Sequence, residues 1–163
     1  MRVARADALD GDELRKQGAV VDAVKNLQRA IELRPSRFEA YATLAECYAE
    51  QGRAGEAMAL FRKAIAADGG RAEWHYRLGK LLGRAGESEL RQAVTLCESN
   101  EARPGWLAVA YFDLAESERA TGKRADAVTH YKRFLGLAKV DSPFRDEALR
   151  ALVSLGSPYE GTP

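Results

Sequence analysis

Two copies of the pentapeptide Gly-Arg-Ala-Gly-Glu, at residues 52–56 and 83–87, have the clearest potential for ligand chemistry. Glycine loops hold phosphate groups when a strand precedes them and a helix follows, because backbone amides then point at the anion. No strand pattern precedes either copy. We therefore interpret both copies as turns between helices rather than as phosphate-binding loops.

The two histidines, His75 and His130, are the candidates for acid–base catalysis. Neither has a Ser, Cys or carboxylate partner at a recognisable catalytic spacing. HExxH, P-loop and metal-cluster motifs do not occur in the sequence. We interpret both histidines as structural, and the sequence predicts no catalysis, no cofactor and no metal site.

Cys47 and Cys97 lie far apart without a CxxC pattern. The sequence predicts two buried free thiols, because free cysteine packs as a small hydrophobe, and a disulfide or redox pair is the alternative. Acidic residues such as Glu116 and Glu118 are interpreted as solvated helix faces. None of these residues indicates an enzyme.

The composition argues against two further classes of function. Lys and Arg number 25 against 24 Asp and Glu, so the basic excess typical of nucleic-acid binding is missing. No apolar run is long enough to span a membrane, and the first residues lack the apolar core of a signal peptide. We expect a cytoplasmic protein, or a periplasmic one if a leader has been removed.

The glycines and apolar residues instead recur with a period of 34 residues. Around Gly52 the pattern contains Leu44, Tyr48, Ala57 and Phe61, and related residues occur once upstream and twice downstream. In this frame Gly86, not Gly83, corresponds to Gly52. Gly52 and Gly86 are therefore each expected to end a helix in the left-handed conformation. The third copy carries two extra residues.

Each repeat is predicted to form two helices, because its apolar residues follow the i, i+3, i+4, i+7 spacing of one helix face. The pattern of aromatic, Leu-Gly/Ala, Tyr, Gly, Ala, aromatic and Ala resembles the tetratricopeptide repeat (TPR). The resemblance implies an all-α, right-handed superhelical solenoid of antiparallel helix pairs, forming a single domain over residues 1–156. The repeats would span residues 4–37, 38–71, 72–107 and 108–141.

The segment after the fourth repeat is predicted to form a capping helix over residues 143–155 that covers the end of the solenoid. Ser142 is its expected N-cap, and Gly156 is expected to end it. Residues 157–163 are expected to be a disordered tail. Trp106 is interpreted as packing against the third repeat, with a second contact surface as the alternative.

The resemblance also implies a concave groove lined by the first helix of each repeat. An aromatic side chain at a groove position is suited to binding, and Tyr76 and Phe112 occupy such positions. The alternative is that the capping helix covers Phe112. The predicted partner-binding residues are Tyr76, Lys80, Arg84, Phe112, Glu116, Arg119, Asp12, Arg15 and Glu46.

We therefore predict a non-catalytic adaptor or scaffold that binds a peptide or helix with an apolar anchor and an acidic flank. The carboxylate clamp that chaperone-binding TPR proteins use is matched only by Arg77, while Asp12 and Glu73 would repel a carboxylate. Hsp70 and Hsp90 tails are therefore disfavoured. The alternatives are a structural or oligomerisation module, with self-association, and RNA binding, which the net charge weakens.

The Ala-, Arg- and Gly-rich composition is similar to that of GC-rich bacteria. Comparable TPR modules serve there in motility, secretion and envelope complexes. That resemblance is the basis for expecting a bacterial scaffold, and no residue of this chain indicates a particular pathway.

Overall fold

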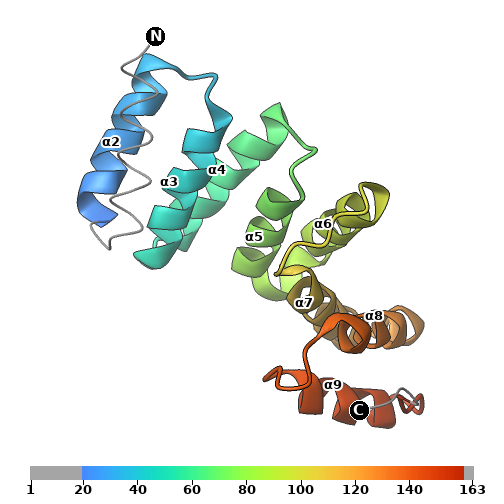
Figure 1. The fold of residues 1–163 in the computed structure, drawn as a ribbon. Coiled ribbons are helices and arrows are strands. Elements are labelled where there is room, and N and C mark those ends of the chain that lie inside the picture. The colour runs from blue at the N-terminus through green and yellow to red at the C-terminus, as the bar shows by residue number, and fades with distance from the viewer. Residues whose placement is uncertain (1–19, 160–163) are drawn as a thin grey trace. The chain divides into compact units, whose positions relative to one another are not determined.

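The computed structural model describes residues 20–159, and within this range the chain forms helices and turns without a strand (Figure 1). The predicted all-α fold is confirmed. The first helix expected in the repeat at 4–37 lies outside the described residues. The helices are α2 (Val20–Leu33), α3 (Phe38–Glu50), α4 (Ala54–Ala67), α5 (Ala72–Leu82), the 3-10 helix η1 (Gly83–Gly86), α6 (Glu87–Ser99), α7 (Leu107–Ala120), α8 (Arg124–Leu137) and α9 (Arg145–Ser154).

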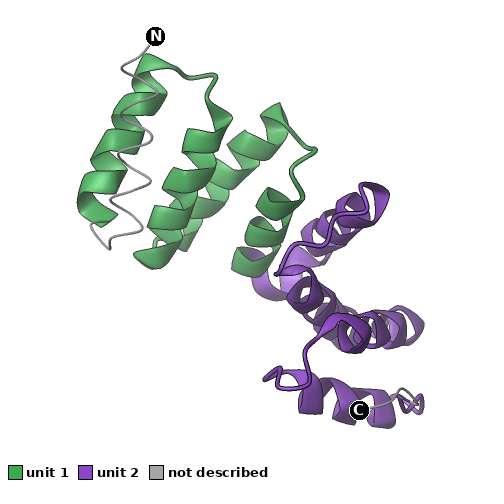
Figure 2. Cartoon of the chain, in the orientation of Figure 1, with its two compact units in different colours: residues 1–81 green, residues 82–163 purple. Residues whose placement is uncertain are grey.

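The backbone divides into two compact units, residues 1–81 and residues 82–163 (Figure 2). The division falls inside the third predicted repeat, between its two helices. The prediction of one domain over 1–156 stays a prediction.

In the first unit, α3 and α4 form an antiparallel hairpin and α2 packs on α3. The two helices of this hairpin can lie close together because small residues face each other between them, and Ala45, Ala57 and Ala64 are completely buried. Phe61 fills the space beside them at 1% exposure. Burial of such apolar surface, at about 25 cal/mol per Å², is the main source of stability for a stacked repeat.

In the second unit, α7 and α8 form the equivalent hairpin, with α6 packed on α7 and α9 on α8. The aromatic side chains of Tyr111, Tyr131 and Phe134 are almost fully buried in it. These residues recur at helical spacing on facing helices, which is the pattern that the sequence predicted. Phe134 also lines a hollow at the surface of this unit.

The turns that end α3 and α7 contain glycine in the left-handed conformation. Gly52 has φ 75° and Gly122 has φ 77°. The amide of Arg53 then bonds to the carbonyl of Tyr48 at 2.9 Å, and that of Lys123 to the carbonyl of Glu118 at 2.8 Å. This bond satisfies a carbonyl that the helix end leaves unpaired.

The prediction that Gly86 plays this part in the third repeat is wrong. Gly83 is the left-handed residue, with φ 57°, and Gly86 is the buried N-cap residue of α6, with φ −87°. The physical reason is that α5 ends at Leu82 and the chain continues directly into the 3-10 turn η1. Both copies of the pentapeptide therefore begin with a left-handed glycine, at Gly52 and at Gly83.

The predicted capping helix is present as α9, which is shorter than the expected 143–155. Phe144 occupies its N-cap without a side-chain hydrogen bond, so the expectation that Ser142 caps the helix is wrong. Gly156, with φ 63°, ends α9 as predicted. Residues 157–159 follow without regular structure, and the rest of the predicted tail, 160–163, lies outside the described residues.

Candidate functional site

The first unit has a hollow of about 240 Å³, which we call the α3–α5 hollow. It is lined by Glu46, Ala49, Glu50, Phe61, Tyr76, Arg77, Lys80 and Leu81. Three of the predicted groove residues, Glu46, Tyr76 and Lys80, are thus brought together here. Arg77 and Leu81 complete the lining from α5.

Helical geometry explains why these side chains share one surface. Glu46, Ala49 and Glu50 follow one another at i, i+3 and i+4 on α3, so they lie on one face. Tyr76 and Lys80 are separated by one turn of α5. The opposite face of α5 is buried through residues such as Trp74 and Leu78, which fixes the helix and turns Tyr76 outward. Tyr76 is half-buried and Lys80 is exposed.

The charges of the α3–α5 hollow are balanced, two acidic against two basic side chains. The Arg77 guanidinium lies 3.1 Å from Glu73 and 3.7 Å from Glu46. Although partial burial of Arg77 opposes its charge, Glu46 and then Glu73 raise the pKa of its guanidinium. Arg77 is therefore held across the hollow by carboxylates of α3 and α5.

The remaining predicted groove residues are not part of this hollow. Asp12 and Arg15 lie outside the described residues. Arg84 belongs to η1 in the second unit, where its carbonyl accepts a hydrogen bond from Ser117 Oγ at 3.2 Å. Its side chain is exposed. Its part in the proposed groove stays a prediction.

Phe112 is not an exposed anchor, contrary to its place in the predicted site. It is 5% exposed, and its ring stacks on Phe144 at a centroid distance of 4.8 Å. Phe134 contacts it from α8 at 5.3 Å. The segment that leads into α9 therefore covers Phe112, which is the alternative that the sequence had left open.

Glu116 and Arg119 are close together on α7 but are bound to each other. Arg119 donates to Glu116 at 2.7 Å and to the Tyr131 hydroxyl at 3.1 Å, and Tyr131 donates in turn to Glu116. The hydrogen bond with Glu116, followed by the one with Tyr131, raises the pKa of Arg119. A partner would have to compete with these bonds.

Both histidines have structural surroundings. His75 is buried with Nε2 3.1 Å from the carbonyl oxygen of Gly69. His130 Nδ1 lies 2.7 Å from Glu118, which is completely buried. The interpretation of Glu118 as part of a solvated face is therefore wrong, because its carboxylate lies between α6, α7 and α8. Cys47 and Cys97 are buried free thiols, as predicted.

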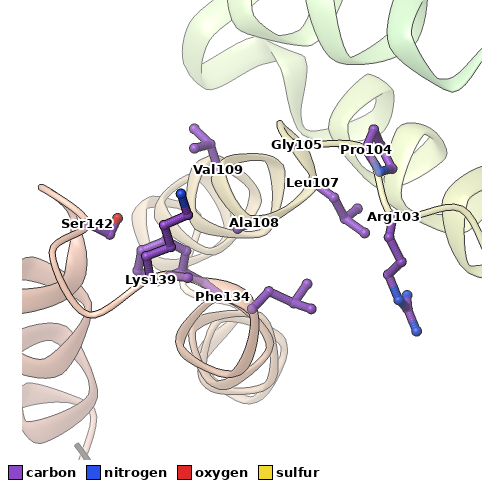
Figure 3. Close-up of a pocket in the computed structure, with 11 residues that line it drawn as sticks. Arg103, Pro104, Gly105, Leu107, Ala108, Val109, Phe134, Lys139 and Ser142 are labelled. Atoms are coloured by element: carbon purple, nitrogen blue, oxygen red, sulfur yellow. The ribbon is translucent and has the colours of Figure 1, made fainter.

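A second hollow, missed by the sequence analysis, lies in the second unit between the start of α7 and the end of α8 (Figure 3). This α7–α8 hollow has a volume of about 410 Å³ and is lined by Arg103, Pro104, Gly105, Leu107, Ala108, Val109, Phe134, Leu137, Ala138, Lys139 and Ser142. The one feature of the sequence that could have indicated this hollow is the pair of extra residues in the third repeat, because they lengthen the loop that leads to α7. Trp106 in that loop is half-buried.

Two further features are missing from residues 20–159. None of their helices has the length and apolar character needed to cross a membrane. No three His, Cys, Asp or Glu side chains in this range are grouped so that they could hold a metal ion.

Repeated antiparallel helix pairs with hollows on their surfaces define a helical-repeat protein. Sequence models described as tetratricopeptide repeat match residues 14–81 and residues 109–137. The chain belongs to the tetratricopeptide repeat family. Proteins of this family are in general protein-interaction modules.

Similar solved structures share this TPR solenoid fold. A MamA chain from Desulfovibrio magneticus RS-1 aligns with a TM-score of 0.80 at 14% identity, over 94% of this chain and 86% of that one. YrrB, described as a TPR protein with an unusual peptide-binding site, aligns with a TM-score of 0.76 at 19% identity, over 91% and 74%. PilF from Pseudomonas aeruginosa aligns with a TM-score of 0.75 at 21% identity, over 94% of this chain and 69% of that one.

A curated relative is the BBSome complex member BBS4 homolog of Drosophila melanogaster. It is 28% identical over 133 residues, which is 80% of this chain and 25% of the relative. The chain thus spans about a quarter of the length of this relative.

Proposed function

We propose that this protein is a non-catalytic adaptor that binds a short segment of a partner protein in the α3–α5 hollow. The segment would place an apolar side chain beside Tyr76 and carry an acidic flank toward Lys80. The observation that supports this most directly is the hollow itself, in which an outward tyrosine, aliphatic carbon from Ala49 and Leu81, and charged side chains converge. Tyrosine in a partly enclosed site is a frequent centre of binding energy.

The surroundings of Arg77 support the exclusion of chaperone tails from this proposal. Of the clamp positions named above, Arg77 is the one match, and Glu73 and Glu46 already compensate its charge. A terminal carboxylate would lie close to these two acidic side chains. A segment whose apolar anchor contacts Tyr76 need not place a terminal carboxylate at that position.

The relatives are consistent with a scaffold role. The BBS4 homolog is described as the member of a complex, and YrrB as a peptide-binding protein. By analogy, this chain would hold one protein within a larger assembly, in the cytoplasm or periplasm of a bacterium. The bacterial origin and the pathway stay predictions.

Photocrosslinking in cells of the source organism tests the proposal. A photoreactive phenylalanine derivative would replace Tyr76 and, as the matched control, Arg62, an exposed residue of α4 outside the hollow. The expected result is a partner protein crosslinked from position 76 and not from position 62. Its mapped peptide should contain an apolar residue next to acidic ones.

The crosslinked segment, made as a labelled peptide, would then be titrated against wild-type protein and Tyr76→Ala. We expect about a tenfold loss of affinity in the variant, in line with the loss of one central aromatic contact. Equal affinity for both proteins would refute the proposal. A crosslink from position 76 to a second copy of this chain would support the oligomerisation module instead.

A further inference from the structure

The α7–α8 hollow differs from the α3–α5 hollow in its charge. Its lining includes Arg103 and Lys139 but no carboxylate, whereas the lining of the α3–α5 hollow is balanced. Among residues 20–159, neither Arg103 nor Lys139 forms an ion pair or a side-chain hydrogen bond. Glu101 and Asp141 are close in sequence but do not line the hollow.

Between the two cations the surface is apolar. Leu107, Ala108 and Val109 from the first turn of α7 meet Phe134 and Leu137 of α8. Figure 3 shows Lys139 on the side of Val109 and Ser142, and Arg103 on the side of Leu107, with Ala108 between them. A volume of about 410 Å³ is in the range of sites that enclose a small group.

The chain as a whole carries a net charge of only +1, so a lining with two cations and no carboxylate is a local feature. The positive amide end of α7 is offset by the negative carboxyl end of α8 at the same hollow, so the favourable charge comes from Arg103 and Lys139. An acidic occupant would thus gain charge complementarity on both sides of the hollow. An apolar side chain would meanwhile cover the surface formed by Leu107, Ala108 and Leu137.

We propose that the α7–α8 hollow binds a partner-protein segment in which one apolar side chain is followed by two carboxylates. The apolar side chain lies on the floor formed by Ala108 and Leu137, and the carboxylates contact Lys139 and Arg103. This site is separate from the α3–α5 hollow, and the inference does not depend on the function proposed for that hollow.

The probe is a fluorescein-labelled hexapeptide with a phenylalanine followed by two aspartates, titrated against the whole chain by fluorescence polarisation. One comparison peptide has asparagines in place of the aspartates, and another has serine in place of the phenylalanine. We expect saturable binding of the first peptide and about tenfold weaker binding of each comparison peptide, because each lacks one of the two complementary features. Backbone amide NMR shifts should change at Val109 and Ala138.

Two double variants with the same change in net charge separate local from general electrostatics. Arg103→Glu/Lys139→Glu should weaken the binding of the acidic peptide by about tenfold or more. Lys132→Glu/Arg150→Glu reverses two exposed cations outside the hollow and should change the affinity by less than about twofold.

Circular dichroism on all proteins shows that the variants remain folded. The inference is refuted if wild-type protein shows no saturable binding, or if the asparagine peptide binds as well as the acidic one. It is also refuted if Arg103→Glu/Lys139→Glu loses no more affinity than Lys132→Glu/Arg150→Glu, which includes the case in which the peptide binds elsewhere and neither variant loses affinity.

Discussion

Glu118 and His130 are joined in the interior of the second unit: His130 Nδ1 lies 2.7 Å from a carboxylate that is completely buried. The other oxygen of Glu118 accepts a hydrogen bond from Arg91 at 2.7 Å. One side chain of α7 thereby connects α6 and α8. A buried charge is tolerated only when it is paired and hydrogen-bonded in this way.

The first prediction concerns this carboxylate. Glu118→Gln should lower the free energy of unfolding by about 2 kcal/mol, because the amide has no negative charge and only one acceptor oxygen, so that either Arg91 or His130 faces an NH2 group instead. The loss is smaller than for a fully enclosed pair, since the Arg91 side chain is 41% exposed and can be hydrated. Urea unfolding followed by circular dichroism measures it.

Glu147→Gln is the matched control for Glu118→Gln, because Glu147 is exposed on α9. It should change the stability by less than about 0.5 kcal/mol. If Glu118→Gln were as stable as this control, the buried pairing would not contribute to folding.

The second prediction concerns pH. The hydrogen bond from Lys123 at 2.6 Å, and next the one from Arg91 at 2.9 Å, lower the pKa of Glu87 below its ordinary value of 4.5. A depressed pKa in the folded state means that the stabilisation is present above about pH 4.5 and is lost as the pH falls toward the folded-state value. Glu87→Gln should therefore be less stable than wild type at about pH 7.

That difference between Glu87→Gln and wild type should shrink as the pH is lowered from about 4.5 to about 3. Denaturant unfolding at a series of pH values provides the comparison. A difference that stays constant over this range would show that the charge of Glu87 is not what stabilises the fold.

The third prediction concerns the stacked pair Phe112 and Phe144. Phe112→Ala should lower the free energy of unfolding by about 3 kcal/mol, the usual effect of removing a buried phenylalanine. Phe144 is half-buried, so Phe144→Ala should cost less. The double variant should show a coupling of about 1 kcal/mol in a double-mutant cycle. Purely additive effects would contradict the observed contact.

The fourth prediction compares glycines of the repeated pentapeptide. Gly52→Ala and Gly83→Ala should each destabilise by about 1 kcal/mol, because alanine disfavours a positive φ. Gly55 lies within α4 and an added Cβ would meet no atom within 4 Å. Gly55→Ala should therefore stabilise by about 0.5 kcal/mol. Thermal unfolding would test all three, and a neutral Gly83→Ala would contradict the left-handed turn.

Much of the fold could be predicted from the sequence because its signals are local. The spacing of Tyr41, Leu44 and Tyr48 defines a helix face without knowledge of any other helix, and α3, α4, α7 and α8 follow from such patterns. The turn at Gly83 was missed because alignment to a fixed period does not reveal that α5 ends early. Both candidate turns contained a glycine, so residue type alone did not distinguish them.

The site was harder to predict because its features depend on contacts between distant residues. Phe112 is covered by Phe144, and no helix pattern in the fourth repeat indicates that. Glu118 resembles any exposed acid in sequence, since its partners Arg91 and His130 belong to other helices. Tyr76, Lys80 and Glu46 could be predicted together because the TPR resemblance supplies the relation between first helices.

The network around Glu118 also bears on how this chain could change by recombination. Repeat proteins commonly gain or lose units by duplication, because each unit contacts its neighbours through similar surfaces. Here Arg91, Glu118 and His130 come from two successive repeats and complete one another's hydrogen bonds. Exchange of the third repeat for a copy from elsewhere in the chain would remove Arg91, and the buried Glu118 carboxylate would keep only His130 as its partner. Recombination that separates these two repeats would therefore lower the stability of the second unit.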